Sequence, residues 1–114
     1  MQAYLFTLLI ALLFGASSIS AENLSSYVQR ANQAWVDKDY RSCQRTLEHV
    51  VDVYGQRGRV VMGSKFGEIY YKKGLAELKL AMQERKRGDE TLARRWFSMA
   101  AESFQICYER YPNE

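Results

Sequence analysis

The side chains best suited to chemistry are a single histidine, two cysteines and several carboxylates at helical spacing. His49 is the only histidine among the 114 residues, and a metal site or an acid–base pair would need further groups converging on it. Neither cysteine has the histidine-paired setting of a nucleophile. Four carboxylates are typical of a solvated helix surface: Glu77, Glu84, Glu102 and Glu109. Several such carboxylates have a lysine or arginine three or four positions away, as Glu77 has Lys73 and Glu84 has Arg87. The sequence therefore predicts no catalytic, metal or cofactor site, and we expect a protein that is not an enzyme.

The first 21 residues differ in composition from all that follow. Residues 1–21 contain no charged side chain, and an apolar block from Ala3 to Phe14 precedes a run of small residues ending at Ala21. This arrangement is typical of a secretory signal peptide cleaved after Ala21, with an uncleaved membrane anchor as the alternative. We therefore expect an exported protein of the periplasm or cell envelope.

Residues 22–114 carry all the charge and have the length of one small domain. The net charge of +3 is distributed along the chain. A mild positive charge that is not concentrated in a basic tail argues against nucleic acid as the partner, especially for an exported protein.

The two cysteines allow two interpretations. An oxidising compartment would permit a disulfide between Cys43 and Cys107. Both residues also occupy positions where helix packing calls for a small side chain, and a buried thiol meets that need. We favour buried thiols, because the two cysteines hold non-equivalent positions of the repeat described below.

Two helices are expected in the first half of the domain. The first is capped by Asn23 or Ser25 and runs to about Lys38. The second is capped by Asp39 and is expected to stop at Gly55. Residues 56–64 then form a glycine-containing connector.

Two more helices are expected in the second half. One starts near residues 64–66 and runs to Arg87, where basic residues face the carbonyl end of the helix. Gly88 can take a left-handed conformation there, and Asp89 caps the last helix, which ends before Pro112. The sequence thus predicts an all-α fold.

A spaced pattern in the second helix returns in the fourth, displaced by 57 residues. Each copy has an aromatic, a small, a bulky and a small or medium residue, then a breaker. The first copy is Tyr40, Cys43, Leu47, Val50, Tyr54 and Gly55; the second is Phe97, Ala100, Phe104, Cys107, Tyr111 and Pro112. Repetition of this kind predicts a helical repeat protein.

The pattern resembles the tetratricopeptide repeat, a unit of two antiparallel helices. The first helices supply the family's aromatic and small positions, namely Tyr27 with Ala31 and Tyr70 with Gly74. They are offset by 43 residues, whereas the second helices are offset by 57, so the second hairpin (about 65–112) is expected to be longer than the first (about 23–55). With the leader and the YYKKG and CYERYPNE stretches, these elongated repeats resemble those of bacterial cell-envelope proteins.

The resemblance implies a scaffold that binds a protein or peptide in an inner groove. The groove residues would be Val28, Asn32, Trp35, Tyr71, Leu75 and Lys79. The alternative is that Trp35, Leu75 and Leu78 belong to the core. A basic tip would meet anionic headgroups or an acidic partner, or else form a solvated helix end; it comprises Arg85, Lys86, Arg87, Arg94 and Arg95.

Two repeat units leave the last helix without a neighbour. Its outer face, with Phe104, Tyr108 and Tyr111, would then support self-association, or the chain would be the front part of a longer array. A second function class remains open, a small helical bundle that binds a small ligand in a closed pocket.

Overall fold

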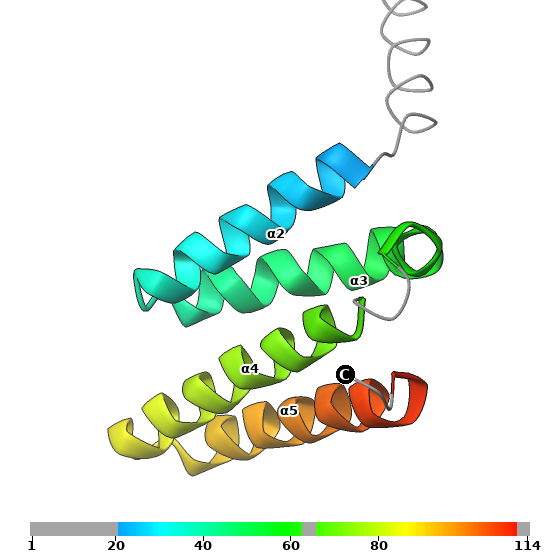
Figure 1. Cartoon of the computed structure of the whole chain (residues 1–114). Helices are drawn as coiled ribbons and strands as arrows, with labels where there is room; N and C mark the ends of the chain where they lie inside the picture. Colours follow the sequence, from blue (N-terminus) through cyan, green and yellow to red (C-terminus); the bar gives the residue numbers. More distant parts are fainter. Residues whose placement is uncertain (1–20, 63–65, 112–114) are drawn as a thin grey trace, which may run out of the picture.

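The chain is all-α over the residues that the computed structural model describes, 21–62 and 66–111. The four helices of this part are α2 (Ala21–Val36), α3 (Tyr40–Met62), α4 (Gly67–Arg87) and α5 (Glu90–Arg110). Each packs along the next, and Figure 1 shows them side by side in chain order with alternating direction. The predicted all-α class is confirmed. The predicted leader lies outside the described residues except for Ala21, which begins α2, and none of the described helices is long and apolar enough to cross a membrane.

Two short turns with the same hydrogen bonds join α2 to α3 and α4 to α5. At the second turn, Gly88 has a φ of 91°, and its N–H donates to the Arg85 carbonyl. At the first turn, Lys38 takes the same left-handed conformation with a φ of 61° and donates to the Trp35 carbonyl. The aspartate that follows each of them donates its N–H further back, Asp39 to Ala34 and Asp89 to Glu84. Each helix pair therefore closes with the left-handed C-terminal motif that satisfies two helix-end carbonyls.

The two turn aspartates also begin the helices that follow. The Asp39 carboxylate accepts the Ser42 N–H at 3.1 Å, and the Asp89 carboxylate accepts the Leu92 N–H at 3.0 Å. These side chains satisfy amide groups that the first turn of a helix leaves without an intrahelical partner. The caps predicted at Asp39 and Asp89 are confirmed. The cap predicted for the first helix at Asn23 or Ser25 is wrong, because both residues lie within α2, which already includes Ala21.

The prediction that α3 ends at Gly55 is wrong, because the helix continues to Met62 and includes most of the expected connector. Glycine destabilises a helix interior by about 1 kcal/mol relative to alanine, which weakens a helix but does not by itself terminate it. Glycine commonly ends a helix by taking a left-handed conformation, and Gly55 has no positive φ.

The core consists of two clusters. The larger joins α2, α3, α4 and the end of α5 around Leu47, Val50, Phe66 and Tyr70. The smaller lies near the α4–α5 turn around Leu80, Ala81 and Trp96, with the partly buried Tyr40 of α3 packed against it.

The second helix pair, α4 with α5, extends further toward its connecting turn than the first pair, α2 with α3. Beyond Tyr70, α4 continues to Arg87, whereas α2 continues beyond Tyr27 only to Val36. The added turns of α4 and α5 enclose the smaller cluster and reach the start of α3, where the Arg41 guanidinium lies 4.9 Å from the Trp96 ring centre.

Candidate functional site

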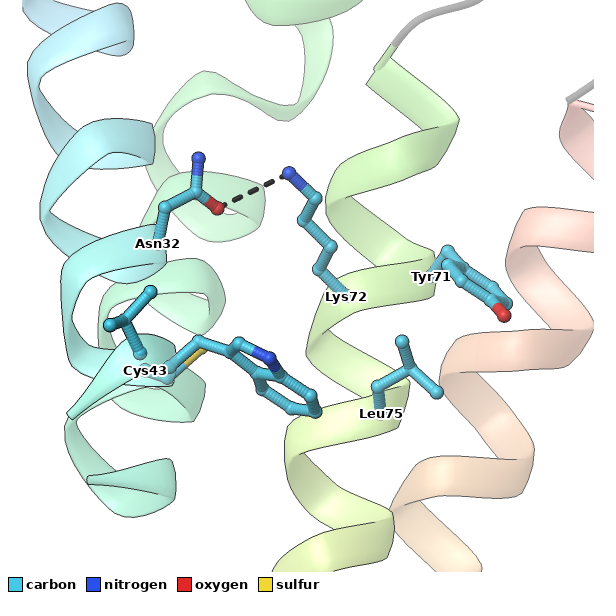
Figure 2. Close-up of a pocket in the computed structure, with 7 residues that line it drawn as sticks. Asn32, Cys43, Tyr71, Lys72 and Leu75 are labelled. Atoms are coloured by element: carbon cyan, nitrogen blue, oxygen red, sulfur yellow. Dashed lines mark hydrogen bonds between the residues drawn. The ribbon is translucent and has the colours of Figure 1, made fainter. Parts of the chain in front are cut away.

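A cavity of about 380 Å³ opens between α2 and α4, with Cys43 of α3 at its back (Figure 2). Its lining residues are Asn32, Trp35, Val36, Cys43, Tyr71, Lys72 and Leu75. Four of the six predicted groove residues are among them. Of the other two, Val28 packs against the larger core cluster, and Lys79 is exposed on α4 beyond the cavity.

Helical spacing brings the lining side chains together. Asn32, Trp35 and Val36 fall on one face of α2, as Tyr71 and Leu75 do on α4. The Trp35 ring meets the Tyr40 ring edge-on, with 5.1 Å between centroids. This contact fixes the indole at the turn, so that Trp35 serves both as packing and as wall.

The cavity wall is largely apolar, with one polar bridge across it. The Lys72 ammonium donates to the Asn32 side-chain oxygen at 3.2 Å, joining α4 to α2 (Figure 2). Two apolar residues at the rim stay open to solvent, since Val36 is 70 % exposed and Tyr71 51 % exposed. An apolar wall with one cation at its edge suits an apolar side chain carried on a polar or acidic ligand.

A second hollow of about 340 Å³ lies on the other side of Tyr71, lined by Glu68, Tyr71, Lys72 and Cys107. Figure 2 shows the Tyr71 ring directed toward α5, where it lies 5.8 Å from the Phe104 ring centre. The two hollows share Tyr71 and Lys72, so a ligand longer than one side chain can contact both.

No disulfide joins Cys43 and Cys107, both of which belong to the described residues. Cys43 is 2 % exposed behind the cavity, and Cys107 is half-buried at the second hollow. Burial raises the pKa of the Cys43 thiol from 9.0 to about 11, an effect that nearby Lys72 opposes and Asp39 reinforces.

We expect Cys43 to resist alkylation in the folded protein. A pKa near 11 leaves about a hundredfold less thiolate at pH 8 than the ordinary value does, and thiolate is the reacting form. Peptide mapping after iodoacetamide treatment should therefore show Cys107 modified first and Cys43 modified only after addition of urea. Equal rates at both positions in the native protein would contradict the buried setting of Cys43.

A buried polar network joins α3, α4 and α5 at the centre of the molecule. Its centre is Glu77, which the sequence predicted to be a surface charge and which is instead 0 % exposed. The Glu77 carboxylate accepts hydrogen bonds from Ser103 at 2.6 Å, Lys73 at 2.8 Å and Gln44 at 3.1 Å. The prediction that Glu77 lies on the surface is wrong. Its carboxylate can be buried because these three donors compensate for the loss of water around the charge.

The network extends from its centre with every buried polar atom paired. Lys73 also donates to the Ser103 hydroxyl at 3.0 Å, and Gln44 accepts from Arg41 at 2.8 Å and donates to Glu48 at 3.2 Å. Within the described chain, no buried side-chain nitrogen or oxygen lacks a hydrogen-bond partner. A closed network of this kind holds structure and leaves no group for a ligand.

The spacing of the inward-facing residues along α4 indicates that Glu77 is buried. Tyr70, Gly74 and Ala81 were all expected on the inner face, and Glu77 lies between them at helical spacing. Lys73 four positions earlier is a matching donor. The spacing thus outweighs residue type as a guide to which face Glu77 occupies.

The basic tip lies on the surface, partly neutralised. Arg85 pairs with Glu90 at 3.4 Å and covers the Phe97 ring, and Arg87 pairs with Glu84 at 3.1 Å. The other three members are exposed: Lys86, Arg94 and Arg95.

The expected outer face of α5 is smaller than predicted. Tyr108 is 79 % exposed, but Tyr111 is only 6 % exposed. The Tyr111 ring stacks on Tyr70 with 6.1 Å between centroids, because α5 ends at Arg110 and the following residue folds back onto α4. Tyr111 therefore belongs to the core, and Pro112 lies outside the described residues.

The remaining candidates for chemistry do not form a site. His49 is exposed and packs against the Tyr27 ring at 5.2 Å. Among the described residues, no three histidine, cysteine or acidic side chains are placed to hold a metal ion.

No protein-family model, curated protein or solved structure matches the chain.

Proposed function

We propose that this chain is an exported, non-enzymatic scaffold of the tetratricopeptide-like class that binds a protein partner in the cell envelope. The observation that carries the proposal is the apolar cavity between α2 and α4, with Val36 and Tyr71 open to solvent at its rim. Exposed apolar side chains around a hollow are typical of sites where a partner inserts an apolar anchor.

Two features support the repeat assignment. The turns after α2 and α4 share a left-handed residue followed by a capping aspartate, Lys38–Asp39 and Gly88–Asp89. The small positions of the pattern are buried at the helix contacts, where a close approach requires them; these are Ala31, Cys43, Gly74 and Ala100. We infer two hairpins of one repeat type, the second elongated.

Ligand binding by a small helical bundle is the second candidate, favoured by the volume of the cavity, which lies within the range of small-molecule pockets. It predicts that a metabolite panel will contain a compound that raises the melting temperature. The scaffold proposal predicts no such compound.

Cross-linking at two matched valines tests the scaffold. Val36 lies at the cavity rim and Val53 on α3 away from it, and both are exposed. A photoreactive amino acid at position 36 should give a discrete protein adduct in intact cells, and the same group at position 53 should not. The adduct should fall at least about tenfold with Tyr71→Ala, since a lost hot-spot aromatic costs binding more than about 1.4 kcal/mol. Equal adducts at both valines, or an adduct that Tyr71→Ala leaves unchanged, would contradict a partner site in the cavity.

A further inference from the structure

The solvent face of α4 carries an apolar stripe that no other described helix covers completely. Tyr71, Leu75, Leu78 and Met82 follow one another at intervals of four, three and four residues. Tyr71 and Met82 are 51 % and 53 % exposed, and the two leucines between them are half-buried outside both core clusters. This is the spacing of the a and d positions of a coiled-coil seam.

The stripe ends where its next position is already occupied. Arg85 follows Met82 by three residues, and its guanidinium covers the Phe97 ring at 4.7 Å and pairs with Glu90. The open part of the seam, from Tyr71 to Met82, is therefore about 16 Å long at 1.5 Å per residue.

A row of lysines runs beside the stripe. Lys72, Lys79 and Lys86 recur every seven residues, and each takes the e position of the heptad that the stripe defines. Lys72 donates to the neutral Asn32 side chain, and Lys79 and Lys86 are exposed. Within the described residues no acidic side chain pairs with any of the three.

We propose that α4 binds an acidic amphipathic helix of a partner protein along this seam. The inference rests on the proposed scaffold function and specifies the chemistry of its partner. The partner helix places apolar residues over Tyr71, Leu75, Leu78 and Met82 and carboxylates at seven-residue spacing opposite the lysines. Its end can insert an apolar side chain into the adjoining cavity, because Tyr71 and Leu75 belong to both surfaces.

The arrangement of α4 disfavours a second copy of this chain as the occupant. An antiparallel pair of α4 helices sets e positions against e positions, so that lysines would face lysines. A parallel pair would bring the lysines to the g positions, and these are Gly74 and Ala81, both buried within their own molecule.

Two synthetic helices of identical apolar content test the charge requirement. Both carry leucine at every a and d position; one has glutamate and the other lysine at every e and g position. Fluorescence anisotropy with the full chain should show the acidic peptide binding at least about tenfold more tightly, with the preference shrinking at about 0.5 M salt. The double variant Lys79→Glu with Lys86→Glu should lose this preference. The matched double reversal on α5, Arg94→Glu with Arg95→Glu, should keep it.

Each alternative outcome contradicts the proposal that an acidic helix binds along the seam. That proposal is wrong if the two peptides bind equally, if neither binds, or if the two double variants lose binding equally. So would binding to anionic phosphatidylglycerol vesicles without binding to the acidic peptide, which would assign the lysines to a lipid surface. If the Val36 cross-link persists while the seam fails, the scaffold stands with a different partner chemistry; if the cross-link also fails, the scaffold itself is wrong.

Discussion

Replacing Glu77 by alanine should lower the free energy of unfolding by about 3–5 kcal/mol, the usual cost of removing one partner from a buried ion pair. The substitution leaves the Lys73 ammonium, whose side chain is only 12 % exposed, without its acceptor at 2.8 Å. Ser103 loses the acceptor of its 2.6 Å hydrogen bond at the same time. For a domain of this size the loss is a large share of the total stability. Urea unfolding followed by the helical circular dichroism signal measures it directly.

A coordinated replacement separates the buried charge from the shape of the side chain. The triple variant Lys73→Met, Glu77→Leu and Ser103→Ala removes the buried ion pair and its hydroxyl partner and keeps similar volumes, while Gln44 retains its hydrogen bond to Glu48. It should recover most of the stability that Glu77→Ala loses, because apolar residues substitute well for a buried ion pair. A triple variant as unstable as the single one would show that packing around position 77, rather than charge, is decisive.

The network also fixes how three helices register against one another. Gln44, Glu77 and Ser103 come from α3, α4 and α5, and their hydrogen bonds are satisfied at one relative position of the helices. Sliding a helix by one turn would leave the carboxylate buried without donors. The register in turn sets which side chains of α4 remain for the outer seam.

The helix boundaries at the two turns were predictable because local chemistry determines them. An aspartate before an amphipathic run is a common helix cap, as Asp39 and Asp89 are here, and Gly88 readily takes the left-handed conformation. Lys38 was not predicted, since a lysine carries no local signal for the left-handed conformation; the hydrogen bonds that close the α2–α3 turn require it there. The same limit explains Gly55, whose local signal for termination is overridden by the rest of α3.

The cavity was largely predictable, and helical spacing predicts the inward face of Glu77, but the hydrogen-bond partners of Glu77 on the other helices were not predictable. Trp35 and Leu75 follow from helical periodicity, as do their neighbours on the same faces. The burial of Glu77 depends on donors from Gln44 and Ser103, which are distant in sequence and come together only through helix packing. Tyr111 likewise joins the core through Tyr70, a contact that no local pattern encodes.

Replacing Gly74 by valine should lower the free energy of unfolding by about 3 kcal/mol, at the upper end of the usual cost of overpacking. A Cβ at position 74 would lie 2.7 Å from the Phe104 ring, closer than carbon atoms tolerate. The ring would have to leave the surface of α4. Gly55→Val is the matched control, because a Cβ at position 55 meets no atom within 4 Å; valine is no worse than glycine in a helix, so its effect should be close to zero.

The clash at position 74 also links stability to the proposed site. Phe104 supports Tyr71, whose ring separates the two hollows and begins the apolar seam. In a Phe104→Ala background the valine has room, so Gly74→Val should there cost much less, and urea unfolding of the four proteins of this cycle measures the difference. Equal costs of Gly74→Val in both backgrounds would show that the Phe104 ring is not the obstacle.

Because the displaced ring would carry Tyr71 with it, Gly74→Val should also weaken the Val36 cross-link, whereas Gly55→Val should leave that cross-link intact. Close packing of α4 on α5 is thus what holds the α4 face in the shape that the proposed partner would meet.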